Sequence, residues 1–410
     1  DDNYGYIRHF PTAEERARKG GNGVYYHISY WGRPHDYLWL GTVHPSLVYQ
    51  QMSLAYERGI QKMWILNVGD IKPAEYQVEL FLDMAWNLEA VKQQGVVAHQ
   101  RQFLEREFGL EVAAQLQPVM QEAYRLAYIR KPEFMGNTRT EEKDPKFKVI
   151  SDLPWSEQEI NERLAAYRQL SDKVEQEWHA LPAQKKETYF QLVKYPVQAA
   201  AQMNNKLLTA QLARHGKADW ADSDRAYDSI VSLTKTYNTT KWNRMMDFQP
   251  RRLLVFNRVE RKALSSGLLE KPQAVYTWNG ADCVEGASVI CEGLGYEGKA
   301  VAVEKKKELT FEFAAWETDS VEVEVRLLPN HPVEGERLRF TISLDGSATE
   351  AVSYETKGRS EEWKENVLCN QAVRRMILPV ARKASHRLIF TALDEGVVLD
   401  QIYLYMPRIK

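Results

Sequence analysis

The amino-terminal part of the chain alternates short β-prone runs with amphipathic runs. Residues 23–32 and 62–70 each lead from an extended apolar core into a turn with glycine and polar side chains. Between them, residues 45–56 carry apolar side chains three and four positions apart, which predicts a helix. Pro73 stands where a proline can open a helix, so a second helix is expected over 74–86. This strand–helix–strand–helix order implies parallel strands in a barrel or a doubly wound sheet.

The middle of the chain, from about residue 89 to 268, has the spacing of helices. Ser156 followed by Glu159 matches a capping box at the start of an amphipathic run. Pro118 and Pro196 lie inside otherwise helical runs and are expected to kink or divide their helices. We predict a bundle of helices over residues 88–108, 110–130, 157–180, 183–215 and 221–237.

The carboxyl-terminal part, from residue 273 to 410, has a period of two. Apolar and polar side chains alternate along several short runs, and turn signals such as Asp345-Gly346 separate them. This pattern predicts an antiparallel β-sandwich. The clearest expected strands are residues 309–313, 321–325, 338–344 and 386–390.

The three patterns predict a multidomain chain with boundaries near residues 88, 268 and 273. Residues 1–88 would form part of a barrel or sheet, 89–268 a helical bundle and 273–410 a β-sandwich. The opening Asp1-Asp2-Asn3 resembles the polar exit of a strand, but no strand precedes it. We therefore expect the 410 residues to be the carboxyl-terminal part of a longer polypeptide.

Composition excludes some classes of function. A net charge of −2 argues against the basic face of a nucleic-acid binder, and no apolar run approaches the ~20 residues of a membrane span. Cys283, Cys291 and Cys369 lack the spacing of metal ligands. Two of them could form a disulfide in a periplasmic or secreted enzyme, or all three could be free buried thiols. No metal and no cofactor is implied.

Polar side chains follow the apolar cores of the two predicted strands. His27 and Tyr30 lie three apart where the first strand ends, Tyr25 alternates with His27, and Asn67 ends the second strand. Burying such groups unpaired costs roughly a few kcal/mol each, and active sites of βα barrels lie at the carboxyl ends of strands. On the residues alone, His27 is more simply a hydrogen-bonded core histidine than a ligand contact.

Longer motifs resemble glycoside hydrolase family 115, whose members are xylan α-1,2-glucuronidases. These motifs follow the family's order and cover essentially the whole chain. They are residues 20–27 (GGNGVYYH), 65–73 (ILNVGDIKP), 78–86 (VELFLDMAW), 241–246 (KWNRMM), 328–332 (LPNHP), 358–368 (GRSEEWKENVL) and 393–400 (LDEGVVLD).

Two segments depart from the family pattern. The family commonly has a histidine where this chain has Arg244, and residues 250–258 look unlike the usual sequence. Substrate contacts that the family makes there are therefore in doubt for this chain.

The resemblance implies the last strands of a catalytic (β/α)₈ barrel (a TIM barrel), followed by the helical domain and the β-sandwich. It also implies hydrolysis, with inversion, of the α-1,2 bond that joins glucuronic acid, or its 4-O-methyl ether, to xylose in glucuronoxylan or glucuronoxylooligosaccharides. Inversion requires an acid and a base about 6.5–9.5 Å apart, and both are expected upstream of residue 1. A periplasmic or secreted location is expected, and the sandwich could pair two subunits into a homodimer.

The same resemblance assigns roles to individual residues. Asp1 is expected in the acid/base network or on a sugar hydroxyl, Asn3 as a hydroxyl contact and His27 as a contact to the uronate, and we group these three as catalytic. A uronate also needs cationic or neutral donors. The expected substrate-binding residues are Tyr25, Tyr30, Asn67, Lys72 and Trp242.

Each assignment has a structural alternative. Asp1 and Asp2 could cap the following turn, Asp70 is expected to cap the helix near Pro73, and Lys72 could form a local salt bridge. Trp242 could be buried between helices.

Two further functional hypotheses remain. The chain could act only at the ends of xylooligosaccharides, or it could be a xylan-binding or scaffolding fragment without catalysis.

Overall fold

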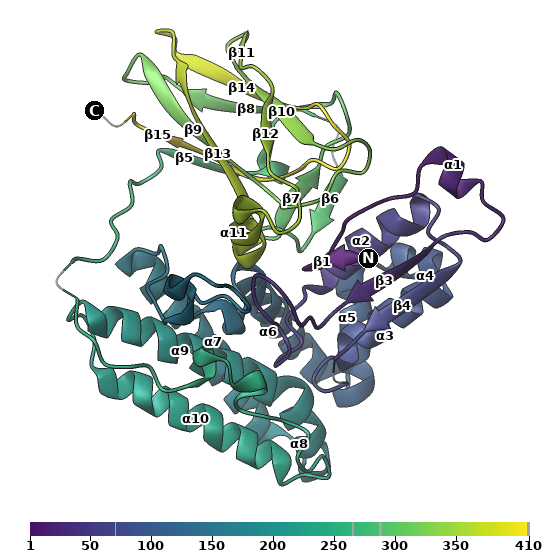
Figure 1. The fold of residues 1–410 in the computed structure, drawn as a ribbon, viewed down its shortest axis with the longest axis vertical. Helices are drawn as coiled ribbons and strands as arrows, with labels where there is room; N and C mark the ends of the chain where they lie inside the picture. Colours follow the sequence, from purple (N-terminus) through teal and green to yellow (C-terminus); the bar gives the residue numbers. More distant parts are fainter. Residues whose placement is uncertain (70, 265, 287–288, 408–410) are drawn as a thin grey trace. The chain divides into compact units, whose positions relative to one another are not determined.

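The computed structural model describes residues 1–69, 71–264, 266–286 and 289–407. Figure 1 shows the helices and strands of the chain. The chain is divided into two compact units. Unit 1 contains Asp1–Tyr26, Ser46–Ile65 and Pro272–Lys410, and unit 2 contains His27–Pro45 and Leu66–Lys271.

Two strands and two helices alternate near the amino terminus: β3 (Gly23–His27), α2 (Pro45–Glu57), β4 (Met63–Asn67) and α3 (Glu75–Trp86). β3 and β4 form a two-stranded sheet. The Lys62 N–H donates to the Asn22 carbonyl (2.9 Å) and the Ile28 N–H to the Asn67 carbonyl (3.1 Å). Since both partners advance together, the strands are parallel, as predicted.

The start of α3 differs from the prediction. Pro73 precedes the helix, which begins at Glu75 after Ala74, and the Ala74 side chain can accept no hydrogen bond from the first turn. Asp70, which was expected to cap this helix, lies outside the described residues.

The first residues form a short antiparallel hairpin between β1 (Asp2–Asn3) and β2 (Tyr6–Ile7). The Asp2 Oδ2 accepts a hydrogen bond from the Gly5 N–H at 2.9 Å. Gly5 has a φ of +90°, a backbone conformation that favours glycine. Asp2 therefore holds this turn, in agreement with the structural alternative for Asp2. A four-residue helix, α1 (Ala13–Arg16), follows.

A helical region follows α3 and makes up most of unit 2. The predicted helix over 88–108 is split at Gly95, whose φ is +80°, and Pro118 stays inside α6 without dividing it. Pro196 is in the first turn of α9, which follows a π-helical turn at Phe190–Lys194. The helices are α4 (Leu88–Gln94), α5 (Val96–Phe108), α6 (Leu110–Ile129), α7 (Glu157–Ala180), α8 (Ala183–Tyr189), α9 (Tyr195–Arg214) and α10 (Trp220–Asn238).

Local sequence explains why these helices begin where they do. Ser156 and Glu159 form the predicted capping box of α7, which satisfies two free N–H groups of its first turn. α9 lies beside α10 (Figure 1), and the rings of Tyr195 and Tyr237 pack between them with centroids 4.9 Å apart. A helical region followed by a β-rich region is thus confirmed.

The β-rich region contains two antiparallel sheets. One consists of β8 (Glu308–Ala314), β10 (Leu338–Leu344), β11 (Ser347–Ala348), β12 (Val352–Tyr354) and β14 (Ser385–Ala392). The other consists of β5 (Tyr276–Asn279), β6 (Val289–Glu292), β7 (Lys299–Ala302), β9 (Ser320–Leu327), β13 (Ala372–Pro379) and β15 (Val398–Tyr405).

Side chains from both sheets meet in one hydrophobic cluster. Phe340 of β10 stacks on Phe390 of β14 with ring centroids 5.1 Å apart, and Val323 of β9 belongs to the same cluster. The predicted turn after β10 is confirmed, because Asp345 and Gly346 both have positive φ, as a tight hairpin requires. A helix not expected from the sequence, α11 (Glu361–Cys369), precedes β13.

Candidate functional site

Three of the predicted site residues lie together in unit 2, at the carboxyl ends of β3 and β4. His27 is 9% exposed, and its ring meets that of Tyr30 edge-on with centroids 5.1 Å apart. Asn67 lies where β4 ends, and its Oδ1 accepts a hydrogen bond from the Gly69 N–H at 3.2 Å. The backbone bond from Ile28 to Asn67 joins the two strand ends. The structure thus brings an imidazole, a phenol and an amide to the ends of these two strands.

Two more predicted residues of unit 2 contact each other. The Lys72 ammonium lies 4.5 Å from the centre of the Trp242 ring and forms an ion pair with Glu75. The structure thus shows the local salt bridge that was one alternative for Lys72.

The turn that carries Trp242 is closed by a side chain. The Asn238 Nδ2 donates to the Met246 carbonyl (2.7 Å), and the Met246 N–H donates to the Asn238 Oδ1 (3.0 Å). Trp242 is half-buried rather than enclosed.

The remaining predicted residues belong to unit 1. Asp1 is exposed and its carboxylate binds the Arg8 guanidinium at 3.3 Å, while Asn3 is half-buried in the β1–β2 hairpin. Tyr25 is 42% exposed although it alternates with His27 along β3.

The loop after β3 is held by a buried carboxylate. Asp36, 1% exposed, accepts hydrogen bonds from the Gly32 N–H (2.9 Å) and pairs with Arg251. The Arg251 guanidinium also lies 3.7 Å from the centre of the Trp31 ring. Burial raises the pKa of Asp36 above its usual value, although Arg251 acts in the opposite direction. Arg251 lies in the segment that departs from the family pattern, and here it holds this loop.

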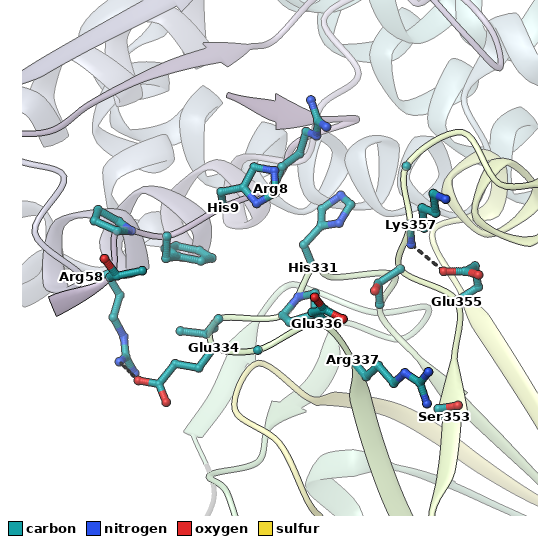
Figure 2. Close-up of a pocket in the computed structure, with 18 of the residues that line it drawn as sticks. Arg8, His9, Arg58, His331, Glu334, Glu336, Arg337, Ser353, Glu355 and Lys357 are labelled. Carbon is teal, nitrogen blue, oxygen red and sulfur yellow. Dashed lines mark hydrogen bonds and ion pairs between the residues drawn. The ribbon is translucent and has the colours of Figure 1, made fainter. Parts of the chain in front are cut away.

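A large cavity in unit 1 was not predicted from the sequence. Its volume is about 1460 Å³, and Figure 2 shows the side chains around it. It is lined by three main segments, residues 8–16, 331–337 and 353–358, with Arg58, Glu362 and Arg374. No periodic pattern could have found it, because these segments lie far apart in the sequence and consist mostly of loop residues.

His331 forms part of the inner surface of this cavity. It is 7% exposed, and its ring lies 6.2 Å from that of the buried Trp363. Burial and the nearby charge of Arg8 lower the pKa of His331 to about 4. The ring is therefore neutral at neutral pH, and Trp363 packs in the interior rather than on a ligand.

Among the described residues, no group of three or more His, Cys, Asp and Glu side chains could hold a metal ion. The three cysteines are free thiols. None of the described helices is both long and apolar enough to cross a membrane.

Comparison with known proteins gives the class of this fold. The family model "Glycosyl hydrolase family 115" matches residues 1–134, and the model "Glycosyl hydrolase family 115 C-terminal domain" matches residues 287–410. Both describe glycoside hydrolases. The chain belongs to glycoside hydrolase family 115.

A solved structure matches along the entire chain. It is a family GH115 4-O-methyl-α-glucuronidase with specificity for decorated arabinogalactans, 65% identical, with a TM-score of 0.98. The match covers 100% of this chain and 54% of that protein, so this chain spans about half the length of its relative. No curated protein matches the chain.

Carbohydrate-binding modules are also among the similar structures, but only weakly. The C-terminal module of a laminarinase from Zobellia galactanivorans is 10% identical, with a TM-score of 0.25, over 32% of this chain and 98% of that module. A module of Cellvibrio mixtus lichenase with cellotriose is 13% identical, with a TM-score of 0.25, over 33% of this chain and 100% of the module. Similarity at this level does not establish a shared fold.

Proposed function

We propose that the protein containing this chain is an α-glucuronidase that releases glucuronic acid, or its 4-O-methyl ether, from the side chains of a plant polysaccharide. The observation that carries this proposal is the 65% identity, over the entire chain, to a 4-O-methyl-α-glucuronidase of the same family. The favoured substrate is glucuronoxylan, with the α-1,2 bond to xylose cleaved by inversion. We also propose that residues 1–88 form part of a catalytic barrel, residues 89–268 a helical domain and residues 273–410 a β-sandwich.

The proposed chemistry assigns polar contacts to the strand ends. His27 and Asn67 would donate hydrogen bonds to the uronate or its hydroxyls, and the Tyr30 ring keeps the His27 imidazole in its orientation by the edge-on contact. Asp1 and Asn3 would contact the reacting sugar. Such contacts raise the rate only where they are stronger in the transition state than in the ground state.

Replacement of individual residues tests this assignment. In the complete protein, Asn3→Ala and His27→Ala should each lower kcat for uronic acid release by roughly ten-fold or more. Asn161→Ala and His179→Ala are matched controls, because both residues are exposed on α7. Full activity in both site variants, with thermal stability unchanged, would exclude the assignment.

The neighbour's specificity gives a second candidate substrate. The solved relative prefers decorated arabinogalactans, so we propose arabinogalactan side chains as the alternative to xylan. Uronic acid release should be compared on glucuronoxylan, on xylooligosaccharides substituted only at their ends, and on arabinogalactan. Faster release from intact glucuronoxylan supports the favoured substrate, whereas binding of all three without release supports a non-catalytic role.

A further inference from the structure

The cavity of unit 1 has walls that are held in place by ion pairs. Arg58 pairs with Glu334 (3.6 Å), and this contact joins the end of α2 to the 331–337 segment. Elsewhere in the lining, Arg374 pairs with Glu362 at 2.6 Å. Figure 2 shows Arg58 and Glu334 meeting at one end of the cavity, with Lys357 and Glu355 at the other. A cavity with fixed walls binds its ligand without the free-energy cost of ordering loops.

Backbone hydrogen bonds fix the wall that carries Glu355 and Lys357. The Lys357 N–H donates to the Glu355 carboxylate at 2.7 Å, and the Glu355 N–H donates to Glu362 at 3.1 Å. In the antiparallel pairing of β10 and β12, Leu338 is opposite Tyr354. Arg337 directly precedes β10 and Glu355 directly follows β12, so these two residues are neighbours and lie on the same side of the cavity.

Three cations of the lining have no carboxylate partner among the described residues: Arg16, Arg337 and Lys357. The Arg16 guanidinium donates a hydrogen bond to the Pro11 carbonyl. Their charge is therefore available to an anion, whereas the charges of Arg58 and Arg374 are already balanced.

The lining also holds acceptors. Glu336 and Glu355 form no ion pair with another described residue, and the Tyr354 and Phe10 rings add apolar surface. Sugar hydroxyl groups donate and accept hydrogen bonds, so a lining with both cations and carboxylates is suited to them. The volume exceeds the roughly 300–1,000 Å³ of a typical small-molecule pocket, which favours several linked sugar rings over one.

We propose that this cavity binds a segment of an acidic oligosaccharide, with a uronate carboxylate held by Arg337 and Lys357. The choice of a uronate rests on the proposed function, whereas the site itself rests on the geometry of unit 1. Arg8 connects the cavity to the proposed catalytic residue Asp1, because it lines the cavity and forms an ion pair with Asp1. The cavity would thus hold the polysaccharide next to a residue that we assign to catalysis.

Binding to variants of the complete protein tests the proposal. The probe is xylotriose carrying one 4-O-methylglucuronic acid, titrated calorimetrically into protein with His27→Ala, which slows turnover during the titration. Arg337→Ala with Lys357→Ala should weaken binding by about ten-fold or more, since the uronate carboxylate loses both of its charge-assisted hydrogen bonds. Glu336→Gln should strengthen binding, because it removes a carboxylate that repels the uronate.

Two controls separate charge recognition from other effects. Arg382→Ala removes an exposed arginine of the same β-rich region that does not line the cavity, and should leave the affinity unchanged. The probe with its carboxylate reduced to an alcohol should bind more weakly than the acidic probe to the His27→Ala protein, and the double substitution should not weaken its binding further. Thermal melting should show the same stability for Arg337→Ala and for Lys357→Ala as for the unsubstituted protein, because neither side chain forms an ion pair with another residue that the structure describes.

The outcomes distinguish this proposal from the proposed function. Equal affinity for the double variant and for protein that retains Arg337 and Lys357 overturns the cavity proposal, whether or not uronic acid is released. Weaker binding only in the double variant supports it. If the protein with His27 intact releases no uronic acid while this difference in binding persists, the proposed function fails and the cavity site stands.

Discussion

Breaking the ion pair between Arg251 and Asp36 should destabilise unit 2 strongly. Asp36 is 1% exposed and keeps its charge through Arg251 and the Gly32 N–H. Thr140 also stabilises this loop, because its Oγ1 donates a hydrogen bond to the Gly32 carbonyl at 2.7 Å. Arg251 also covers one face of Trp31. Arg251→Ala would leave a buried carboxylate with no cation beside it.

The expected loss follows from these contacts. Removing one partner of a buried pair costs about 3–5 kcal/mol, and the lost contact with Trp31 adds about 0.5–1 kcal/mol. For a folding unit of this size, such a loss lowers the midpoint of thermal unfolding by roughly 10 °C. Burial already raises the pKa of Asp36, and the raised pKa means that the folded state favours the protonated acid. The destabilisation should therefore be smallest near pH 4 and grow as the pH rises to neutral.

Calorimetric melting at pH 4 and pH 7 measures both effects. Arg252→Ala is the matched control, because Arg252 is an exposed neighbour with the same φ of +52° as Arg251. Adding Asp36→Asn to Arg251→Ala should recover much of the loss at pH 7, since no charge then remains buried. A midpoint for Arg251→Ala within about 1 °C of the unsubstituted protein would refute the argument.

Three further substitutions test other parts of the fold. Burial raises the pKa of Asp400 from 3.8 to about 6. The protonated Asp400 therefore contributes about 3 kcal/mol to the free energy of unfolding below pH 4, and this contribution is lost as the pH rises through 6. Asp400→Asn should flatten this pH dependence when unfolding by denaturant is measured. Phe340→Ala should cost about 3–5 kcal/mol, because the stacked contact with Phe390 and its buried volume are lost. Asn238→Ala should speed proteolytic cleavage after residue 238, because the two bonds to Met246 are removed, while unchanged cleavage would contradict that role.

Much of the secondary structure could be predicted because it has a period. The capping box at Ser156 and the turn at Asp345-Gly346 were both identified from side-chain type alone, and each has a backbone requirement that few residues meet. The break at Gly95 has no periodic signal, and the positive φ of this residue gives its physical reason. Pro118 is expected from its type to disturb its helix, but α6 continues through it and packs against α5 and α7.

The candidate sites were predictable to different degrees. His27, Tyr30 and Asn67 follow apolar strands, so topology alone predicts that they gather at one edge, and the parallel pairing of β3 and β4 confirms that arrangement. The cavity gave no such signal. Arg58 and Arg337 line it from positions almost 280 residues apart, and only the folded chain brings them together.

The distribution of paired and unpaired cations bears on how a uronate would be held. Lys72 was expected to reach the carboxylate, but its charge is shared between Glu75 and the Trp242 ring. Arg251, the cation in the segment that departs from the family pattern, is committed to Asp36. Recruiting either for a ligand would leave a carboxylate unpaired, and that cost would offset the gain. Arg337 forms no ion pair with another described residue, so binding a uronate to it leaves no protein carboxylate unpaired. Binding the uronate at the cavity of unit 1 therefore avoids that free-energy cost.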